Sequence, residues 1–293
     1  MNEKPSPSAF RQTVARLALV CLGIYAVICL GCASWQRHLI FVPPRFSPDD
    51  VDRSARNARL ERWRDPSGQA IGMKRLAPTQ PAAGQLLVLY GNGSWSAGCA
   101  HYADGIQSVA AFDVYILEYP GYADRAGSPS QERLFQAAAE ALPLLDTNRP
   151  VYVLGESLGT GVAAHLAGTH PDKITGLILL SPFNRLTGVA QQHMPFLPVR
   201  LLLVDRFPSE VYLAQYHGPV GMTVDGCDNV VPEKFGQLLY DGYAGPKHLW
   251  RFPGGDHIAI AEPPARFWTE VLAFWRTNAP AQGPGQPVPT VAK

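Results

Sequence analysis

The sequence predicts an α/β protein with a mostly parallel central sheet and helices on both faces. From residue 85 onward, short apolar runs alternate with glycine-rich turns and helical stretches, as expected for parallel strands joined by crossover helices. The apolar runs are nearly continuous, which is typical of strands buried on both faces. With 293 residues, of which 46% are hydrophobic and 17% charged, the chain is long enough and apolar enough for one large domain.

Composition argues against several other classes of protein. Lysine and arginine number 25 against 24 acidic residues and form no basic stripe, so no nucleic-acid partner is expected. The 27 glycines and 27 prolines argue against coiled coils and long helical arrays. The five cysteines show neither CxxC nor Cys/His zinc-ligand spacing, so we predict no structural metal.

Residues 1–36 are predicted to be a signal sequence or a membrane anchor. Lys4, Arg11 and Arg16 precede an uncharged apolar run, Leu17–Ala33. As a helix this run would span roughly 25 Å, just short of the ~30 Å hydrocarbon core, so both cleavage and retention are open. Positive charge before the run predicts that the rest of the chain lies outside the cytoplasm, which in a bacterium is the periplasm.

The end of the apolar run also resembles a bacterial lipoprotein signal. The stretch C-L-G-C ends at Cys32, with small residues around that cysteine, although Cys29 stands where leucine is usual. Cys32 is therefore a candidate lipidation site.

The domain is expected to occupy residues 37–277. An early part, residues 39–44 and 62–78, is expected to supply one or two antiparallel strands. Helices are expected over residues 130–145, where Ser130 is a weak N-cap candidate, and 160–168. The tail, residues 278–293, is rich in Pro, Gly and Gln and is predicted to be disordered. The strands predicted for the parallel part of the sheet are 85–91, 112–119, 150–155, 174–181, 219–224 and 247–253.

Ser157 is the candidate nucleophile. It lies in G-E-S-L-G, directly after the strand 150–155 and directly before a helical run. A strand that turns sharply into a helix needs small residues beside the turn, and Gly155, Gly159 and Gly161 supply them. Such a turn exposes the hydroxyl above the sheet, at a helix N-terminus that stabilises developing negative charge. The structural alternative is a serine that only caps the helix.

A serine nucleophile needs a base, and the base needs an acid that holds it in the right tautomer. His257, in F-P-G-G-D-H after the last predicted strand, is the leading base, and His101 is its competitor. Asp228, in V-D-G-C-D-N-V-V-P after the strand 219–224, is the leading acid, and Asp225 is the alternative. The chain order Ser, Asp, His is that of α/β-hydrolases.

A glycine-rich loop, Y-G-N-G-S-W, follows the first parallel strand. Its glycines allow backbone N–H groups to approach a reacting carbonyl, so the loop is a candidate oxyanion hole. The expected donors are the N–H groups of Asn92, with Gly93 as a further candidate, and of Leu158, the residue after the nucleophile. A simple turn after a strand is the alternative.

Several motifs in the same order carry a family resemblance. They include L-I-F-V-P-P, Y-G-N-G, E-Y-P-G-Y-A-D-R-A-G-S-P-S, G-E-S-L-G-T-G, L-P-V-R-L-L-L-V-D-R-F, D-N-V-V-P and P-G-G-D-H. From about Leu39 to Trp275 the chain resembles serine hydrolases of the α/β-hydrolase fold, most closely a membrane-associated branch that includes depalmitoylating thioesterases. The resemblance implies a Ser157/Asp228/His257 triad, no cofactor, and ester or thioester hydrolysis through an acyl-enzyme.

The chain departs from this family pattern at three positions. Tyr90 stands where histidine is usual, Pro120 where arginine is usual, and Asp225 where histidine often precedes the glycine ahead of the acid. Tyr90 leaves open how rigidly the oxyanion loop is held. The family's strand order also places Cys99 and Cys227 about three strands apart, roughly 14 Å, which is too far for a disulfide.

Residues 194–204, M-P-F-L-P-V-R-L-L-L-V, fall over the expected mouth of the site. They either line an acyl pocket or form an ordinary helix on the sheet. Together with the anchor, an apolar entrance suggests a lipid or acylated substrate delivered from the bilayer. A serine peptidase or amidase on the same scaffold, and a catalytically silent anchored binding module, are the alternative functions.

Overall fold

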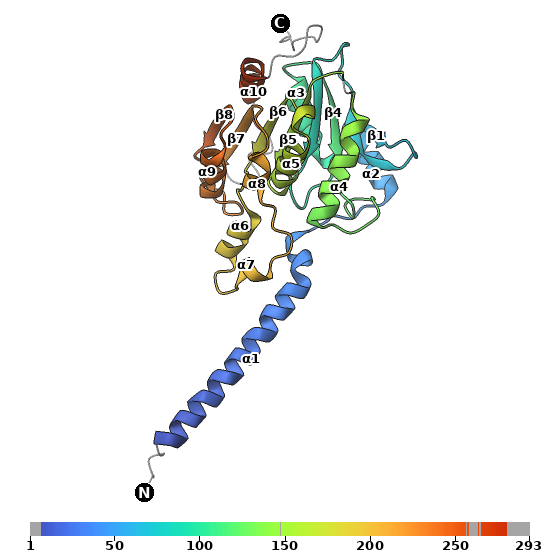
Figure 1. Cartoon of the computed structure of the whole chain (residues 1–293). Coiled ribbons are helices and arrows are strands. Elements are labelled where there is room, and N and C mark those ends of the chain that lie inside the picture. Colours follow the sequence, from blue (N-terminus) through green and yellow to red (C-terminus); the bar gives the residue numbers. More distant parts are fainter. Residues whose placement is uncertain (1–6, 147, 256, 258–262, 264, 280–293) are drawn as a thin grey trace.

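The computed structural model describes residues 7–146, 148–255, 257, 263 and 265–279. A twisted sheet lies at the centre with helices on both faces, and one long helix projects away from it (Figure 1). The strands are β1 (Glu61–Arg64), β2 (Ala70–Arg75), β3 (Gly84–Leu89), β4 (Phe112–Leu117), β5 (Val151–Glu156), β6 (Gly176–Leu180), β7 (Val220–Asp225) and β8 (Lys247–Phe252).

The strands are arranged in the order β1-β2-β4-β3-β5-β6-β7-β8. Both pairings of β2, with β1 and with β4, are antiparallel, and the pairings from β4 to β8 are parallel. Every residue of β3, β6 and β7 is buried, which explains their continuous apolar sequences. The predicted mostly parallel sheet is confirmed, and each of the six predicted strands is present within two residues of its expected bounds.

The lead-in region confirms one part of its prediction and corrects another. β1 and β2 are the antiparallel strands expected between residues 62 and 78. Residues 39–44 form no strand, because Leu39 and Ile40 belong to the long first helix and the chain after them is irregular. Two prolines in this stretch, Pro43 and Pro44, lack the N–H that a sheet ladder requires.

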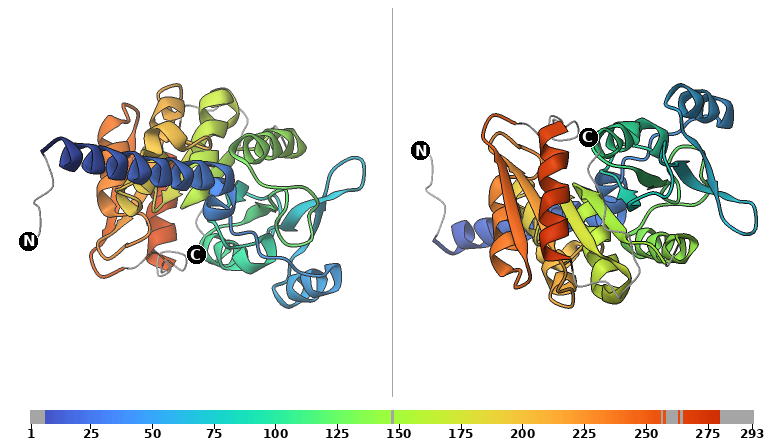
Figure 2. Two further views of the ribbon diagram at one scale, coloured as in Figure 1. Left: turned by 90° about the horizontal axis from the view of Figure 1, so that it is seen from below. Right: turned by 90° about the horizontal axis from the view of Figure 1, so that it is seen from above.

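Helices cover both faces of the sheet. Figure 2 shows α10 across one face from above, and α3 packs against it, with Gly105 facing the indole of Trp268. Ser130 caps α4, since its Oγ accepts from the N–H of Arg133 at 3.2 Å. The helices described are α1 (Pro7–Ile40), α2 (Pro48–Asn57), α3 (Ala100–Gln107), α4 (Gln131–Ala141), α5 (Leu158–Thr169), α6 (Leu186–His193), α7 (Val199–Leu202), α8 (Ser209–Leu213), α9 (Glu233–Gly242) and α10 (Ala265–Asn278), with short 3-10 helices at Ser96–Cys99, Leu142–Leu144 and Pro171–Lys173.

The first helix is longer than the apolar run predicted it to be. The segment Phe10–Ile40 has 31 residues, and its most apolar 18-residue window has a mean hydropathy of 2.4. As a helix the segment spans about 46 Å. By length and composition this segment can cross a membrane, because the helix continues through the residues on both sides of Leu17–Ala33. Residue 36, the predicted boundary of the anchor, lies inside α1. The predicted tail, residues 278–293, starts one residue too early, because Asn278 is the last residue of α10; from residue 280 it lies outside the described residues.

The two cysteines of the domain are both free, one buried and one exposed. Cys99 follows β3 and Cys227 follows β7, and these strands are three positions apart in the observed order, as predicted.

Candidate active site

Ser157 lies at the sharp turn between β5 and α5. Its backbone has φ 48° and ψ −115°, a sparsely populated conformation for a residue with a side chain. Two hydrogen bonds hold the turn: the N–H of Ser157 donates to the carbonyl of Leu180 at 2.8 Å, and the N–H of Thr160 donates to the carbonyl of Ser157 at 2.9 Å. Strain at a side chain that faces a cavity is typical of a functional residue.

Glycines allow this turn to pack closely against β3. A Cβ added at Gly159 would lie 1.9 Å from the carbonyl oxygen of Leu89, and one added at Gly155 would lie 2.8 Å from that of Gly159. The space that the sequence predicted beside Ser157 is therefore required by backbone contacts.

Gly159→Ala is expected to destabilise the domain by about 3 kcal/mol, since the new methyl group meets a backbone carbonyl. For a domain of this size that corresponds to a Tm lowered by roughly 10 °C, measured by thermal denaturation of the full chain in detergent. Gly242→Ala is the matched control, because nothing lies within 4 Å of its added Cβ. Equal Tm values for the two variants would contradict the prediction.

Three side chains from distant parts of the chain form a hydrogen-bonded series. The Oγ of Ser157 lies 3.0 Å from Nε2 of His257, and Nδ1 of His257 lies 2.7 Å from Oδ2 of Asp228. The other oxygen of Asp228 accepts from the N–H groups of Val230 and Val231 at 2.8 and 2.7 Å. The Asp228 carboxylate is therefore fully engaged and holds the imidazole toward Ser157.

This arrangement shifts the pKa values of both partners. Burial lowers the pKa of His257, but the hydrogen bond and charge of Asp228 outweigh that effect and the pKa is raised. Burial raises the pKa of Asp228, but the hydrogen bonds from His257 and the two amides outweigh it and the pKa is lowered. At neutral pH Asp228 is ionised, and its charge stabilises the imidazolium that forms when His257 takes a proton.

Activity is expected to fall on the acid side with a midpoint above the ordinary histidine value of about 6.5. The neutral imidazole is the active form of the base, and a raised pKa means that His257 becomes protonated at a higher pH. The measurement is kcat/KM from pH 5 to 9. A profile that stays flat down to pH 5 would contradict a role for His257 as base.

The competing candidates, Asp225 for the acid and His101 for the base, contact other residues. Asp225 accepts a hydrogen bond from Oγ of Ser181 at 3.1 Å, and Nδ1 of His257 is bonded to Asp228. His101 lies in α3 with its ring against Tyr102, the ring centroids 4.1 Å apart. The structure therefore places the leading acid and base, and not these alternatives, in line with Ser157.

The candidate oxyanion residues line the same cavity as Ser157. Asn92 and Leu158 both border it, and a Cβ at Gly91 would lie 3.3 Å from that of Ser157. Leu158 is the first residue of α5, so its N–H has no acceptor within the helix and is available to a bound group.

The side chain of Asn92 has a structural function that the sequence did not indicate. Its Nδ2 donates to the carbonyl of Ile40, while its Oδ1 accepts from the N–H of Val42 and from the hydroxyl of Tyr122, both at 2.8 Å. Asn92 thus joins the oxyanion loop to the end of α1. Nothing in the Y-G-N-G motif signals the contact with the end of α1, because Ile40 and Val42 lie 52 and 50 residues away in the chain.

Tyr90 takes part in a buried network that fixes the same loop. Its hydroxyl donates to the carboxylate of Glu118, which also accepts from the N–H and Oγ of Ser96 at 3.1 and 2.6 Å. The N–H of Tyr119 donates to the Tyr90 hydroxyl at 3.1 Å, and the Tyr119 hydroxyl donates to the Tyr90 carbonyl at 3.1 Å. Tyrosine at this position therefore leaves the loop firmly held.

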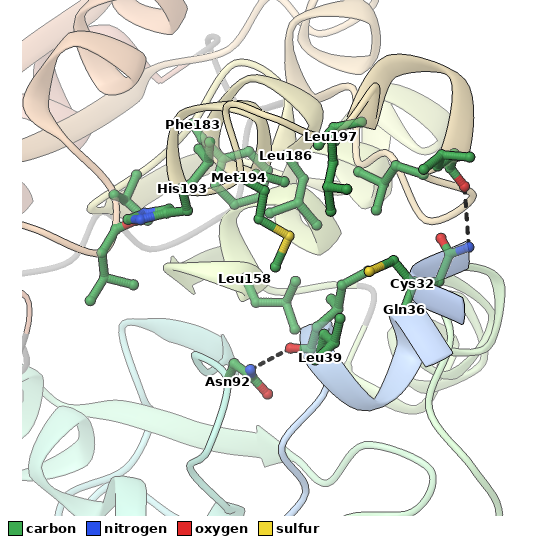
Figure 3. Close-up of a pocket in the computed structure, with 18 of the residues that line it drawn as sticks. Cys32, Gln36, Leu39, Asn92, Leu158, Phe183, Leu186, His193, Met194 and Leu197 are labelled. Atoms are coloured by element: carbon green, nitrogen blue, oxygen red, sulfur yellow. Dashed lines mark hydrogen bonds between the residues drawn. The ribbon is translucent and has the colours of Figure 1, made fainter. Parts of the chain in front are cut away.

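An apolar cavity of about 300 Å³ opens beside Ser157 (Figure 3). One wall is the cap segment, residues 186–204, which contains α6 and α7. Five residues of the stretch 194–204, which was expected either to line a pocket or to form an ordinary helix on the sheet, border the cavity. This stretch therefore lines a pocket. The five residues are Met194, Leu197, Val199, Leu202 and Leu203.

Comparisons of the sequence and of the structure with known proteins agree on one fold. A model of the alpha/beta hydrolase fold matches residues 85–256. An uncharacterized protein of Mycobacterium tuberculosis is 33% identical over 254 residues, 83% of this chain and 86% of that protein. A lysophosphatidylserine lipase of Danio rerio is 32% identical over 167 residues, 49% of this chain and 43% of the lipase. The solved structure of Est1E from Butyrivibrio proteoclasticus shares the fold with a TM-score of 0.59 at 15% identity, over 75% of this chain and 99% of Est1E.

Proposed function

Since the chain belongs to the α/β hydrolase fold family, we propose that it is a serine hydrolase that cleaves carboxylic ester or thioester bonds through an acyl-enzyme on Ser157. One observation carries the proposal: the contacts of 3.0 and 2.7 Å that join Ser157 to His257 and His257 to Asp228. A hydroxyl bonded to an imidazole, which is in turn bonded to a buried carboxylate, is the arrangement that activates a serine.

The proposed reaction has two steps. Nε2 of His257 takes the proton of the Ser157 hydroxyl while Oγ attacks the carbonyl carbon of the substrate. The backbone N–H groups of Asn92 and Leu158 stabilise the oxyanion that forms. His257 then protonates the departing alcohol or thiol, which leaves an acyl ester on Oγ. In the second step a water molecule, deprotonated by His257, releases the acid and restores the serine. The side chains supply both the nucleophile and the proton transfer, so the reaction requires no cofactor or metal.

We further propose that the substrate is a lipid-like or acylated molecule and that α1 attaches the protein to a membrane, with the catalytic domain outside the cytoplasm. The apolar cavity beside Ser157 and the length and hydropathy of α1 support this. The related lysophosphatidylserine lipase, whose name describes a lipid substrate, supports it as well.

The reaction type is tested by comparing three substrate classes on the purified full chain: p-nitrophenyl acyl esters, acyl thioesters and aminoacyl p-nitroanilides. Esters or thioesters are expected to be cleaved much faster than the anilides. Faster cleavage of the anilides would identify a peptidase on the same scaffold. The absence of turnover on all three by folded protein would favour a silent binding module.

A further inference from the structure

One face of α1 contacts the cap segment as far back as Tyr25, about four turns before the helix ends at Ile40. The hydroxyl of Tyr25 donates to the carbonyl of Phe196 at 2.8 Å, and Cys29, one turn later, is only 9% exposed. Val27 and Leu30, on other faces of the same turns, are 69% and 66% exposed. Residues 25, 29, 32, 36 and 40 repeat at helical spacing, so they form a single face. This face contacts the domain, Ala33, Arg37 and Leu39 beside it make further contacts, and most other residues of the helix are exposed.

Polar contacts lock the last turns of α1 to the cap segment and the domain. Gln36 donates to the carbonyl of Leu202 at 3.2 Å and accepts from the N–H of Val204 at 2.7 Å. Arg37 forms an ion pair of 2.9 Å with Asp205, a side chain only 4% exposed. The other oxygen of Asp205 accepts from the N–H of Gln131, at the start of α4. The helix is therefore held at a fixed position relative to Ser157.

The cavity beside Ser157 lies between this face of α1 and the cap segment. Five residues of α1 border it: Cys32, Ala33, Gln36, Leu39 and Ile40. In Figure 3, Asn92 and Leu158 lie at one side of the cavity, whereas Cys32 and Gln36 lie at another, along the helix. Asn92 bonds to Ile40, and Cys32 is eight residues earlier, about 12 Å along the helix axis.

Beyond Cys32 and Ala33, residues of α1 no longer border the cavity. Cys29, the next residue on the face beyond Cys32, is buried and does not border the cavity. The bond between Tyr25 and Phe196 joins α1 to the cap segment beyond that point. An apolar chain that starts at Ser157 and runs along α1 therefore has a defined end near Cys32 and Ala33.

We propose that α1 is more than an apolar helix long enough to cross a membrane: it also supplies one wall of the acyl-binding pocket. In this pocket, Cys32 and Ala33 limit the length of the acyl chain that fits. This inference rests on the proposed function of Ser157. It identifies the substrate class as medium-chain acyl esters or thioesters, whose chain lies beside the helix and extends about 12 Å at most. Cleavage of the chain after residue 36 would remove Cys32, Ala33 and Gln36 from the pocket, so the form with this selectivity is the one that retains α1.

The test uses Ala33→Trp in the full chain, in detergent micelles of fixed composition. The measured quantity is the ratio of kcat/KM for p-nitrophenyl decanoate to that for p-nitrophenyl butyrate. An indole that fills the far end of the pocket is expected to lower this ratio by at least about tenfold, since each methylene of fit in an apolar pocket contributes on that scale. Val27→Trp is the matched control, because it adds the same group to an exposed face of the helix. Its ratio is expected to equal that of the wild type.

Two further measurements separate this inference from the proposed function. Labelling of Ser157 by a fluorophosphonate and the Tm show that each variant is folded and has a reactive serine. If both variants label and cleave butyrate but share the wild-type ratio, the pocket wall is not α1 and this inference fails, while the proposed function stands. If the wild type strictly prefers acetyl esters, or neither labels nor cleaves any ester, this inference fails with its premise.

Discussion

Ser157→Ala is expected to abolish labelling by a fluorophosphonate probe and to lower kcat by on the order of a million-fold. The hydroxyl of Ser157 is the group that lies 3.0 Å from the base, and alanine leaves His257 with no proton to take from this position. The fold should be retained, because the side-chain oxygen makes no capping bond to α5. The measurements are probe labelling and turnover of the preferred ester.

Ser181→Ala is the matched control for this variant. Ser181 lies just after the end of the neighbouring strand β6, is buried, and also has a positive φ of 47°. Its hydroxyl is bonded to Asp225 and not to His257, so labelling should persist. Labelling of Ser157→Ala that equals the wild type would show that the reactive serine is elsewhere.

Asp228→Asn is expected to lower kcat by about ten-thousand-fold with the fold intact. An asparagine amide that donates to Nδ1 of His257 would place the imidazole proton on Nε2, where it blocks proton transfer from Ser157. KM should change little, since Asp228 does not border the cavity. The measurement is kcat and KM for one ester at the pH of maximal activity.

Asp225→Asn distinguishes the two candidate acids. Asp225 is buried at the end of β7 and is hydrogen-bonded to Ser181. Neutralising Asp225 removes one of the charges that raise the pKa of His257, but His257 keeps its hydrogen bond to Asp228. A much smaller loss of kcat than for Asp228→Asn is expected. A larger loss would make Asp225 the acid.

Most of the architecture follows from local sequence. The strands are visible as apolar runs because both faces of the sheet are covered, and the tight turn at Ser157 is visible because only glycine fits beside it. The three side chains predicted to act together could be named because each follows a strand in the sheet, and the carboxyl ends of parallel strands meet at one edge. Of the two stretches expected to supply one or two antiparallel strands, the second contributes β1 and β2, and residues 39–44 contribute none because Leu39 and Ile40 belong to α1.

Only the tertiary structure shows how α1 packs against the domain. The sequence by itself determined that an apolar N-terminal helix precedes an α/β domain with a serine at a strand-to-helix turn. It did not reveal that Tyr25 contacts Phe196, that Asn92 joins the oxyanion loop to Ile40, or that α1 borders the cavity. Hydrophobic period and turn chemistry act over a few neighbouring residues and can be read along the chain. A cavity wall is a shape made by residues as far apart in the chain as Cys32 and Val231, and it exists only after they pack.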